Sequence, residues 1–188
     1  MSAPDVVTLD GARIDPLAGP AGGLALFVFL SEGCPIARAM SPEIERLGRR
    51  ALDAGVAVAL VYPDPFARVE EIRAHQQAFG LSLPAIRDPR HDVVNAVGAT
   101  ISPEAALVRF RKDGGFDLVY RGRINDLYAA PGRRRPAATS QDLETALASA
   151  LAGRAPDPAR TEAVGCIIEP LRETPAAASP TANTPSAP

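Results

Sequence analysis

Two uninterrupted apolar runs, separated by one helical stripe, constrain the fold of this chain more than any other feature. The runs cover residues 24–30 and 56–62, and continuous apolar strands are typical of a sheet that is covered on both faces. Between them, apolar side chains recur at helical spacing, namely Ile36, Met40, Ile44, Leu47 and Ala51. Pro42 falls inside this stripe, so we expect one helix with a kink there. Strand, helix and strand in this order predict a unit of two parallel strands.

Shorter elements are predicted on either side of this unit. Asp10-Gly11 is a hairpin turn between two short apolar segments, and Thr139 with Asp142 forms a capping-box pattern at a helix start. The other predicted elements are a helix at 67–79, a short strand at 84–86, a short helix at 91–97, two strands at 105–110 and 116–120, and a last helix that ends near Gly153. We therefore expect an α/β fold with a central mixed sheet flanked by helices and an N-terminal hairpin extension.

The length of 188 residues suits one domain. We expect it to cover residues 1–153, followed by an extension at 154–172 that packs on the domain and carries Cys166. Residues 173–188 are rich in Pro, Ala, Ser and Thr, so they lack the apolar surface needed for order, and we expect a disordered tail there.

Charge and hydropathy exclude several classes of partner. The net charge is −2, which gives no electrostatic reason to expect nucleic acid or an acidic membrane. No apolar run is long enough to span a bilayer, and the N-terminus shows no signal-peptide pattern, so we expect a cytoplasmic protein. The glycine-rich residues 19–23 precede a strand and lack the ending of a phosphate loop. We expect no cofactor and no membrane partner.

Cys34 is the strongest candidate for chemistry. Pro35 follows it directly, and proline is favoured at the first position of a helix. Cys34 is therefore expected at the N-cap, where free N–H groups and the helix dipole stabilise a thiolate. Glu32 would oppose this effect if it points at the sulfur, and Arg38 would assist it. The alternative is an inert buried cysteine.

The segment from Phe27 to Ile44 resembles the active-site strand, turn and helix of thioredoxin-fold redox proteins. In that fold a nucleophilic cysteine opens a helix, and a kink proline follows at the spacing of Cys34 and Pro42. Residues 99–108 resemble the loop that presents a cis-proline beside the active cysteine. The resemblance implies a thioredoxin-like fold, a cis bond between Ser102 and Pro103, and a substrate groove. The groove residues it implies are Ser31, Pro35, Ser102 and Pro103.

More specifically, residues 6–168 resemble bacterial redoxin-domain proteins of the alkyl hydroperoxide reductase/thiol-specific antioxidant, or peroxiredoxin-like, group. The shared phrases are CPIA, VYPDP, PAIRD, YRGRINDLY and AVGCII. The resemblance implies a thiol-based oxidoreductase. Its substrate would be a peroxide or a disulfide, and its reductant a thiol donor such as a thioredoxin-like protein.

The chain departs from both patterns of these families. A thioredoxin-type C-x-x-C motif would need a second cysteine where Ala37 stands. In the peroxiredoxin pattern P-x-x-x-T-x-x-C, Ser31 can replace Thr, but Phe27 occupies the Pro position. The catalytic arginine of that family would have to come from Arg121 or Arg123, and the alternative for both is a salt bridge with Asp126 or Asp88.

Cys166 is the second candidate cysteine. Many two-cysteine peroxiredoxins carry the peroxidatic cysteine early and the resolving cysteine late, so the resemblance implies that Cys166 folds back to resolve Cys34 through a disulfide. The alternative is that the apolar island around it, residues 164–168, is an edge strand with an incidental cysteine.

A binding role without turnover is the other class of function that the sequence leaves open. A thioredoxin-fold protein that lacks C-x-x-C can dock a partner, or hold copper as a chaperone through thiolates, which suit Cu(I). The two histidines give little support for a metal site or for a Cys–His hydrolase. His75 has the surroundings of an exposed helix face, and His91 stands at a helix start. We predict no metal site.

Overall fold

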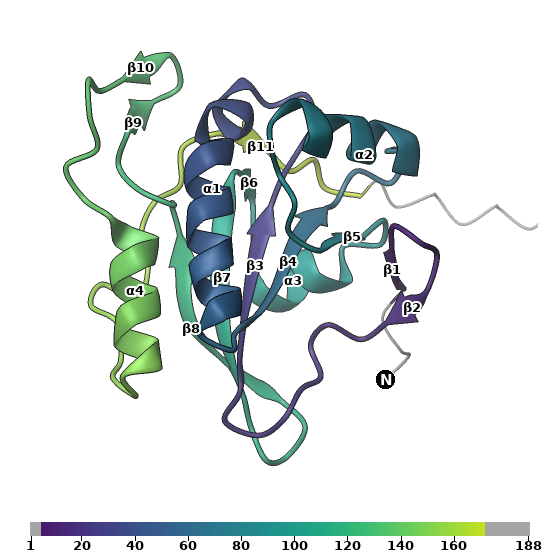
Figure 1. The fold of residues 1–188 in the computed structure, drawn as a ribbon, viewed down its shortest axis with the longest axis vertical. Coiled ribbons are helices and arrows are strands. Elements are labelled where there is room, and N and C mark those ends of the chain that lie inside the picture. The colour runs from purple at the N-terminus through teal and green to yellow at the C-terminus, as the bar shows by residue number, and fades with distance from the viewer. Residues whose placement is uncertain (1–4, 172–188) are drawn as a thin grey trace, which may run out of the picture.

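The computed structural model describes residues 5–171, which are built around a seven-stranded sheet (Figure 1). Its strand order is β2-β1-β5-β4-β3-β7-β8. In chain order the strands are β1 (Val6–Thr8), β2 (Arg13–Ile14), β3 (Leu24–Phe29), β4 (Ala57–Tyr62), β5 (Ala85–Arg87), β7 (Glu104–Phe110) and β8 (Phe116–Gly122). The predicted tail at 173–188 lies outside the described residues.

The sheet is mixed, as predicted. Strands β3, β4 and β5 are parallel to one another, whereas β7 runs antiparallel to β3 and β8 antiparallel to β7. The N-terminal hairpin of β1 and β2 adds to the sheet beside β5. Two further strand pairs lie outside this sheet. They are β9 (Tyr128–Ala130) with β10 (Arg133–Arg134), and β6 (Ile101–Ser102) with β11 (Cys166–Ile167).

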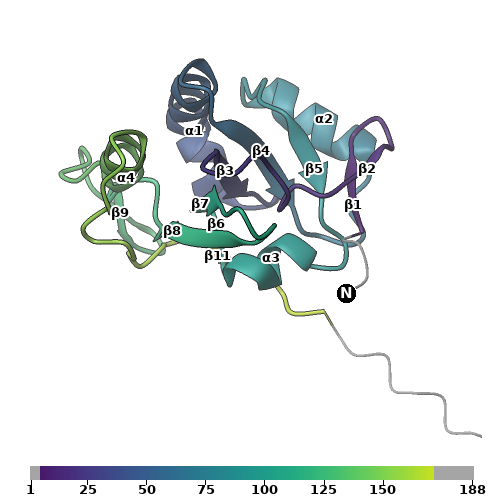
Figure 2. The same ribbon diagram turned by 90° about the horizontal axis from the view of Figure 1, so that it is seen from below.

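Helices cover both faces of the sheet. They are α1 (Pro35–Asp53), α2 (Val69–Ala78), α3 (Asp92–Val97) and α4 (Asp142–Leu151). Figure 2 shows α1 and α2 on one face and α3 on the other, with α4 beside the edge strand β8. Along β3, Leu26 and Val28 pack in the core beneath α1, and Phe27 and Phe29 pack in the core beneath α3. Both faces of β3 are therefore buried, which explains its uninterrupted apolar sequence.

Helix α1 is a single helix from Pro35 to Asp53, with Pro42 inside it, as predicted. Its buried face carries the apolar stripe that the sequence indicates. The strand that precedes α1 and the helix itself therefore place Cys34 at the carboxyl-terminal edge of the parallel strands.

The predicted capping box at Thr139 and Asp142 is wrong. Helix α4 begins at Asp142, after Gln141 as the N-cap residue. The backbone N–H and the hydroxyl of Thr139 both donate to the carboxylate of Asp126 instead. Thr139 therefore binds a carboxylate from a distant loop and does not cap α4. The predicted end of this helix is confirmed, because Gly153 follows it with φ of 72°.

Candidate functional site

Cys34 is the N-cap residue of α1, and Pro35 is the first residue of the helix. The sulfur of Cys34 accepts a hydrogen bond from the backbone N–H of Ala37 over 3.5 Å. Its thiol donates to the carbonyl oxygen of Ser102 over 3.0 Å. The side chain is only 1% exposed. Free N–H groups of the first helical turn therefore face the sulfur, where they favour negative charge.

The segment before β7 lies against this sulfur. The Ser102–Pro103 peptide bond is cis, as the resemblance implied. Ser102 and Pro103 are buried, and the Ser102 hydroxyl accepts a hydrogen bond of 2.8 Å from the backbone N–H of Ser31. Three of the four predicted groove residues thus surround Cys34, and the fourth, Pro35, is exposed beside it.

Cys166 lies at the same place. Strand β11 pairs antiparallel with β6, and in this register Cys166 lies opposite Ser102. In the view of Figure 1, β11 lies behind the N-terminal end of α1. Burial and the neighbouring Cys34 thiol raise the pKa of Cys166 to about 11. Both cysteines are free thiols. The structure therefore brings two cysteines that are distant in the sequence into one site, and it also forms the edge strand named as the alternative.

Arg121 does not reach this site through any hydrogen bond or ion pair within residues 5–171. Its guanidinium pairs with Glu104 over 3.4 Å and donates to the carbonyl oxygens of Val97 and Gly98. Val97 and Gly98 lie at the end of α3, and Glu104 is the first residue of β7. Arg121 therefore ties α3 to the sheet, and its partner is neither of the aspartates that the sequence suggested.

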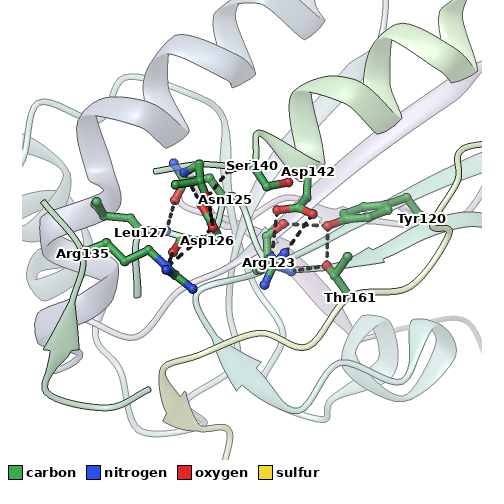
Figure 3. A network of polar contacts seen from close by, with 10 residues as sticks. Tyr120, Arg123, Asn125, Asp126, Leu127, Arg135, Ser140, Asp142 and Thr161 are labelled. Atoms are coloured by element: carbon green, nitrogen blue, oxygen red, sulfur yellow. Dashed lines mark hydrogen bonds and ion pairs between the residues drawn. The ribbon is translucent and has the colours of Figure 1, made fainter. Parts of the chain in front are cut away.

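Arg123 is closer to the site but is also paired. Its guanidinium binds the carboxylate of Asp142, with a shortest distance of 2.8 Å, as Figure 3 shows. This pair raises the pKa of Arg123, because Asp142 accepts its hydrogen bonds. Arg123 also lines a small cavity together with Pro103 and Ile36. Its placement links α4 to the edge of the candidate site.

Within residues 5–171, neither Glu32 nor Arg38 forms a hydrogen bond with the Cys34 sulfur. Arg38 donates to the backbone carbonyl of Glu32 over 2.7 Å and stacks over the ring of Phe79. Burial raises the pKa of the Glu32 carboxyl, and the charges of Asp64 and Glu71 raise it further. The groups that act on Glu32 thus belong to the region around α2.

The histidines lie elsewhere, and one prediction about them is wrong. His75 is only 5% exposed, because its ring packs against the rings of Tyr62 and Phe79. His91 is buried and contacts the carbonyl oxygen of Pro63. Among residues 5–171 no three Cys, His, Asp or Glu side chains gather as a ligand set for a metal ion.

The sequence reasoning missed two residues of the segment that leads to Cys166. Thr161 is held by the backbone of Arg121 and by Tyr120, whose hydroxyl lies 2.6 Å from the Thr161 hydroxyl. Val164 lines the small cavity beside Pro103. The apolar character of Val164 was visible in the sequence, but no local pattern indicates which surface it covers.

A larger cavity lies away from the cysteines. It measures about 560 Å³ and lies between the N-terminal hairpin and the sheet, with Ala25, Phe27 and Ile86 among its lining residues. Neither cysteine lines it. No helix within the described residues is long and apolar enough to cross a membrane.

The sheet order, the helix placement and the cis-proline loop beside a helix-capping cysteine define a thioredoxin-like fold. No protein-family model matches the sequence, and no curated protein matches it.

Solved structures of similar fold include proteins with and without a stated activity. An uncharacterized conserved protein from Geobacillus kaustophilus is 22% identical, with 92% of each chain covered and a TM-score of 0.71. A hypothetical protein from Sinorhizobium meliloti 1021 is also 22% identical, with 87% of this chain and 88% of that chain covered and a TM-score of 0.69. A secreted disulfide oxidoreductase of Mycobacterium tuberculosis, homologous to E. coli DsbE, is 21% identical, with 76% of this chain and 92% of that chain covered and a TM-score of 0.50.

Proposed function

We propose that this protein is a thiol–disulfide oxidoreductase in which Cys34 and Cys166 form the redox-active pair. One observation carries the proposal. The Cys34 thiol donates to Ser102, and Ser102 lies opposite Cys166 in the β6–β11 pair. A local C-x-x-C motif is thereby replaced by two cysteines that meet through the fold.

The two sulfurs have different surroundings, and these suggest different roles. Cys34 lies at the start of α1, where the N–H of Ala37 faces the sulfur and the positive end of the helix dipole attracts negative charge. Burial and the Cys34 thiol raise the pKa of Cys166, so at neutral pH it is a thiol. We therefore assign Cys34 as the nucleophile and Cys166 as the resolving cysteine.

The proposed reaction balances as two thiol–disulfide exchanges. The Cys34 thiolate attacks one sulfur of a substrate disulfide, and the other substrate sulfur leaves as a thiolate. Cys166 then loses its proton and attacks the Cys34 sulfur, which releases the second substrate thiolate and forms the Cys34–Cys166 disulfide. Two electrons pass from the protein to the substrate. An external thiol donor, such as a thioredoxin-like protein, reduces the protein again.

A disulfide is the substrate we propose, in line with the disulfide oxidoreductase of similar fold. The redoxin resemblance also implies peroxide as an oxidant of Cys34, and this stays a prediction. Arg121 and Arg123 were expected to assist either reaction. Their pairing with Glu104 and Asp142 leads us to propose structural roles for both.

The test is oxidation of the reduced protein with oxidised glutathione, followed by mass spectrometry of non-reduced peptides. We expect a Cys34–Cys166 crosslink in the wild type and a stable glutathione adduct on Cys34 in Cys166→Ser. In Cys34→Ser we expect a much slower adduct on Cys166. Separate adducts on both cysteines of the wild type, with no crosslink, would contradict the proposal. So would retention of stoichiometric Cu(I) without disulfide exchange, which would favour the binding role. Hydrogen peroxide in place of glutathione tests the peroxide prediction.

A further inference from the structure

The nucleophile assigned above is closed off from any substrate. Cys34 is 1% exposed, and the cavity beside Pro103 measures about 10 Å³. A cavity of that size holds at most about one water molecule. A disulfide of another molecule therefore cannot reach the Cys34 sulfur in this arrangement.

A covering segment, residues 162–168, closes the site. Within it, Val164 lines the cavity beside Pro103, and Cys166 pairs with Ser102. Gly165 packs so closely on the carbonyl group of Ser102 that a Cβ atom at this position would overlap it. The covering segment thus lies on the backbone of β6, directly over the group that receives the Cys34 hydrogen bond.

The covering segment is held by few backbone hydrogen bonds, and none of its side chains is fully buried, although Val164, Cys166 and Ile168 pack against the core. Strand β11 has two residues, and Ile167 is 68% exposed. Glu162, its first residue, and Glu169, which follows it, are exposed, and Ile168 donates one backbone hydrogen bond of 2.9 Å to Thr100. A short strand with few backbone hydrogen bonds and no fully buried side chain opens at a lower free energy than the core.

The chain before the covering segment is held firmly. The backbone N–H of Thr161 donates to the carbonyl oxygen of Arg121, and the Arg121 N–H donates to Ala159. The Thr161 hydroxyl contacts Tyr120 and accepts a hydrogen bond from the backbone N–H of Arg123. The covering segment can therefore leave β6 while the chain stays anchored at Thr161.

We propose that the covering segment is a detachable strand, and that an extended, cysteine-bearing segment of a partner protein takes its place on β6. The inference rests on the proposed function. The structure supplies the template for this partner, since the chain's own cysteine already lies opposite Ser102 in antiparallel register. Strand addition at an exposed edge supplies affinity through backbone hydrogen bonds whatever the partner's other side chains.

The exchange then proceeds on β6. A cysteine of the partner segment, which is part of a disulfide, lies opposite Ser102 and is attacked by the Cys34 thiolate, while the partner's second sulfur leaves as a thiolate. The covering segment returns as the partner segment departs, and the Cys166 thiolate attacks Cys34 and expels the partner's first sulfur. The partner segment binds β6 first and the covering segment returns second, so the attack by Cys34 precedes the attack by Cys166.

The test measures access to Cys34 in the reduced full-length protein, with iodoacetamide as the probe and Cys166→Ser as the background. Gly165→Val should detach the covering segment because its side chain would overlap Ser102, and we expect Cys34 to be alkylated at least tenfold faster. Glu169→Val is the matched control in an exposed position, and we expect no change. A peptide of residues 161–171 with serine in place of Cys166 should restore protection in Gly165→Val, and a scrambled peptide should not.

Equal alkylation rates with and without Gly165→Val would overturn the inference, as would a peptide that gives no protection. Hydrogen exchange of the wild type supplies a second measurement that needs no variant. We expect the Ile168 amide to exchange at least a hundredfold faster than the amides of β3, and equal protection would overturn the inference. These measurements involve no disulfide, so they remain decisive even if the Cys34–Cys166 crosslink of the proposed function does not form.

Discussion

The thiol of Cys34 donates a hydrogen bond of 3.0 Å to the carbonyl oxygen of Ser102. This contact joins the start of α1 to the segment before the cis-proline, and the pairing of Ser102 with Cys166 adds the C-terminal extension. Three parts of the chain that are far apart in sequence therefore meet at one sulfur.

The pH dependence of Cys166 alkylation reports on its neighbour. Burial and the Cys34 thiol raise the pKa of Cys166 to about 11, so in the reduced wild type its alkylation rate should rise toward pH 11. The alkylation rate of an ordinary cysteine rises toward about pH 8.5, which is its usual pKa. In Cys34→Ala the profile should move to lower pH, although burial keeps it above the ordinary range. Iodoacetamide labelling followed by peptide mapping separates the two cysteines. A Cys166 profile that is unchanged in Cys34→Ala would contradict the contact.

Arg121 should contribute to stability and leave the reactivity of Cys34 unchanged. Its partner Glu104 has a side chain that is only 5% exposed, so removing the guanidinium leaves a buried carboxylate without its ion pair. We expect Arg121→Met to lower the free energy of unfolding by about 1–3 kcal/mol. Arg121→Met/Glu104→Gln should recover part of that loss, because the buried charge is gone.

Urea denaturation of the two single variants and the double variant measures this coupling, and the rate of Cys34 alkylation is the control for chemistry. Glu104 keeps hydrogen bonds from the backbone N–H groups of Thr100 and Ile101 in every variant that retains it. A fall in alkylation rate with unchanged stability would instead assign Arg121 to the chemistry, as the redoxin resemblance implies.

Asp126 should give the protein an acid-sensitive stability. Figure 3 shows its carboxylate holding the chain before α4. Hydrogen bonds from the Thr139 hydroxyl and the Ser140 N–H, with the nearby charge of Arg135, lower the pKa of Asp126 to about 2. Because the folded pKa lies below the unfolded value, this stability is present above about pH 4 and is lost as pH falls toward 2.

The measurement is the urea midpoint of unfolding between pH 2 and pH 7, in the range set by the folded and unfolded pKa values of an aspartate. Asp126→Asn should lower the midpoint at neutral pH and flatten its fall in acid. Asp53→Asn, on the exposed end of α1, should follow the wild type. If Asp126→Asn keeps the full acid dependence, another carboxylate is responsible.

The local parts of this fold could be predicted from the sequence, and the contacts between distant parts could not. The structure confirms the elements that depend on neighbouring residues. They are the two strands within the apolar runs, the helix that begins at Pro35 and the hairpin at Asp10. Thr139 was misassigned because its partner Asp126 lies in another loop. The neighbour of Cys166 was available only from the family resemblance, since no spacing in the sequence indicates that β11 lies on β6.

The burial of His75 also depends on a contact with a distant part of the chain, which the sequence does not indicate. Polar neighbours in the sequence indicated an exposed side chain, but α2 buries it against Tyr62, whose hydroxyl lies 2.9 Å from its Nδ1 atom. Burial lowers the pKa of His75, and the charge of Arg38 lowers it further. Because the folded pKa lies below the unfolded value of about 6.5, the stability from neutral His75 is present above that pH and is lost as the pH falls below it.

We therefore expect the urea midpoint of the wild type to decrease between about pH 7 and pH 5, where a histidine with a lowered pKa takes up its proton on unfolding. In His75→Gln, which keeps a polar group near Tyr62 but cannot be charged, this decrease should be much smaller, although the midpoint at pH 7 also falls through the loss of packing. His91→Asn is the comparison variant for the other histidine. If the decrease disappears in His91→Asn and persists in His75→Gln, the pH dependence belongs to His91, and the burial of His75 does not control the response to acid.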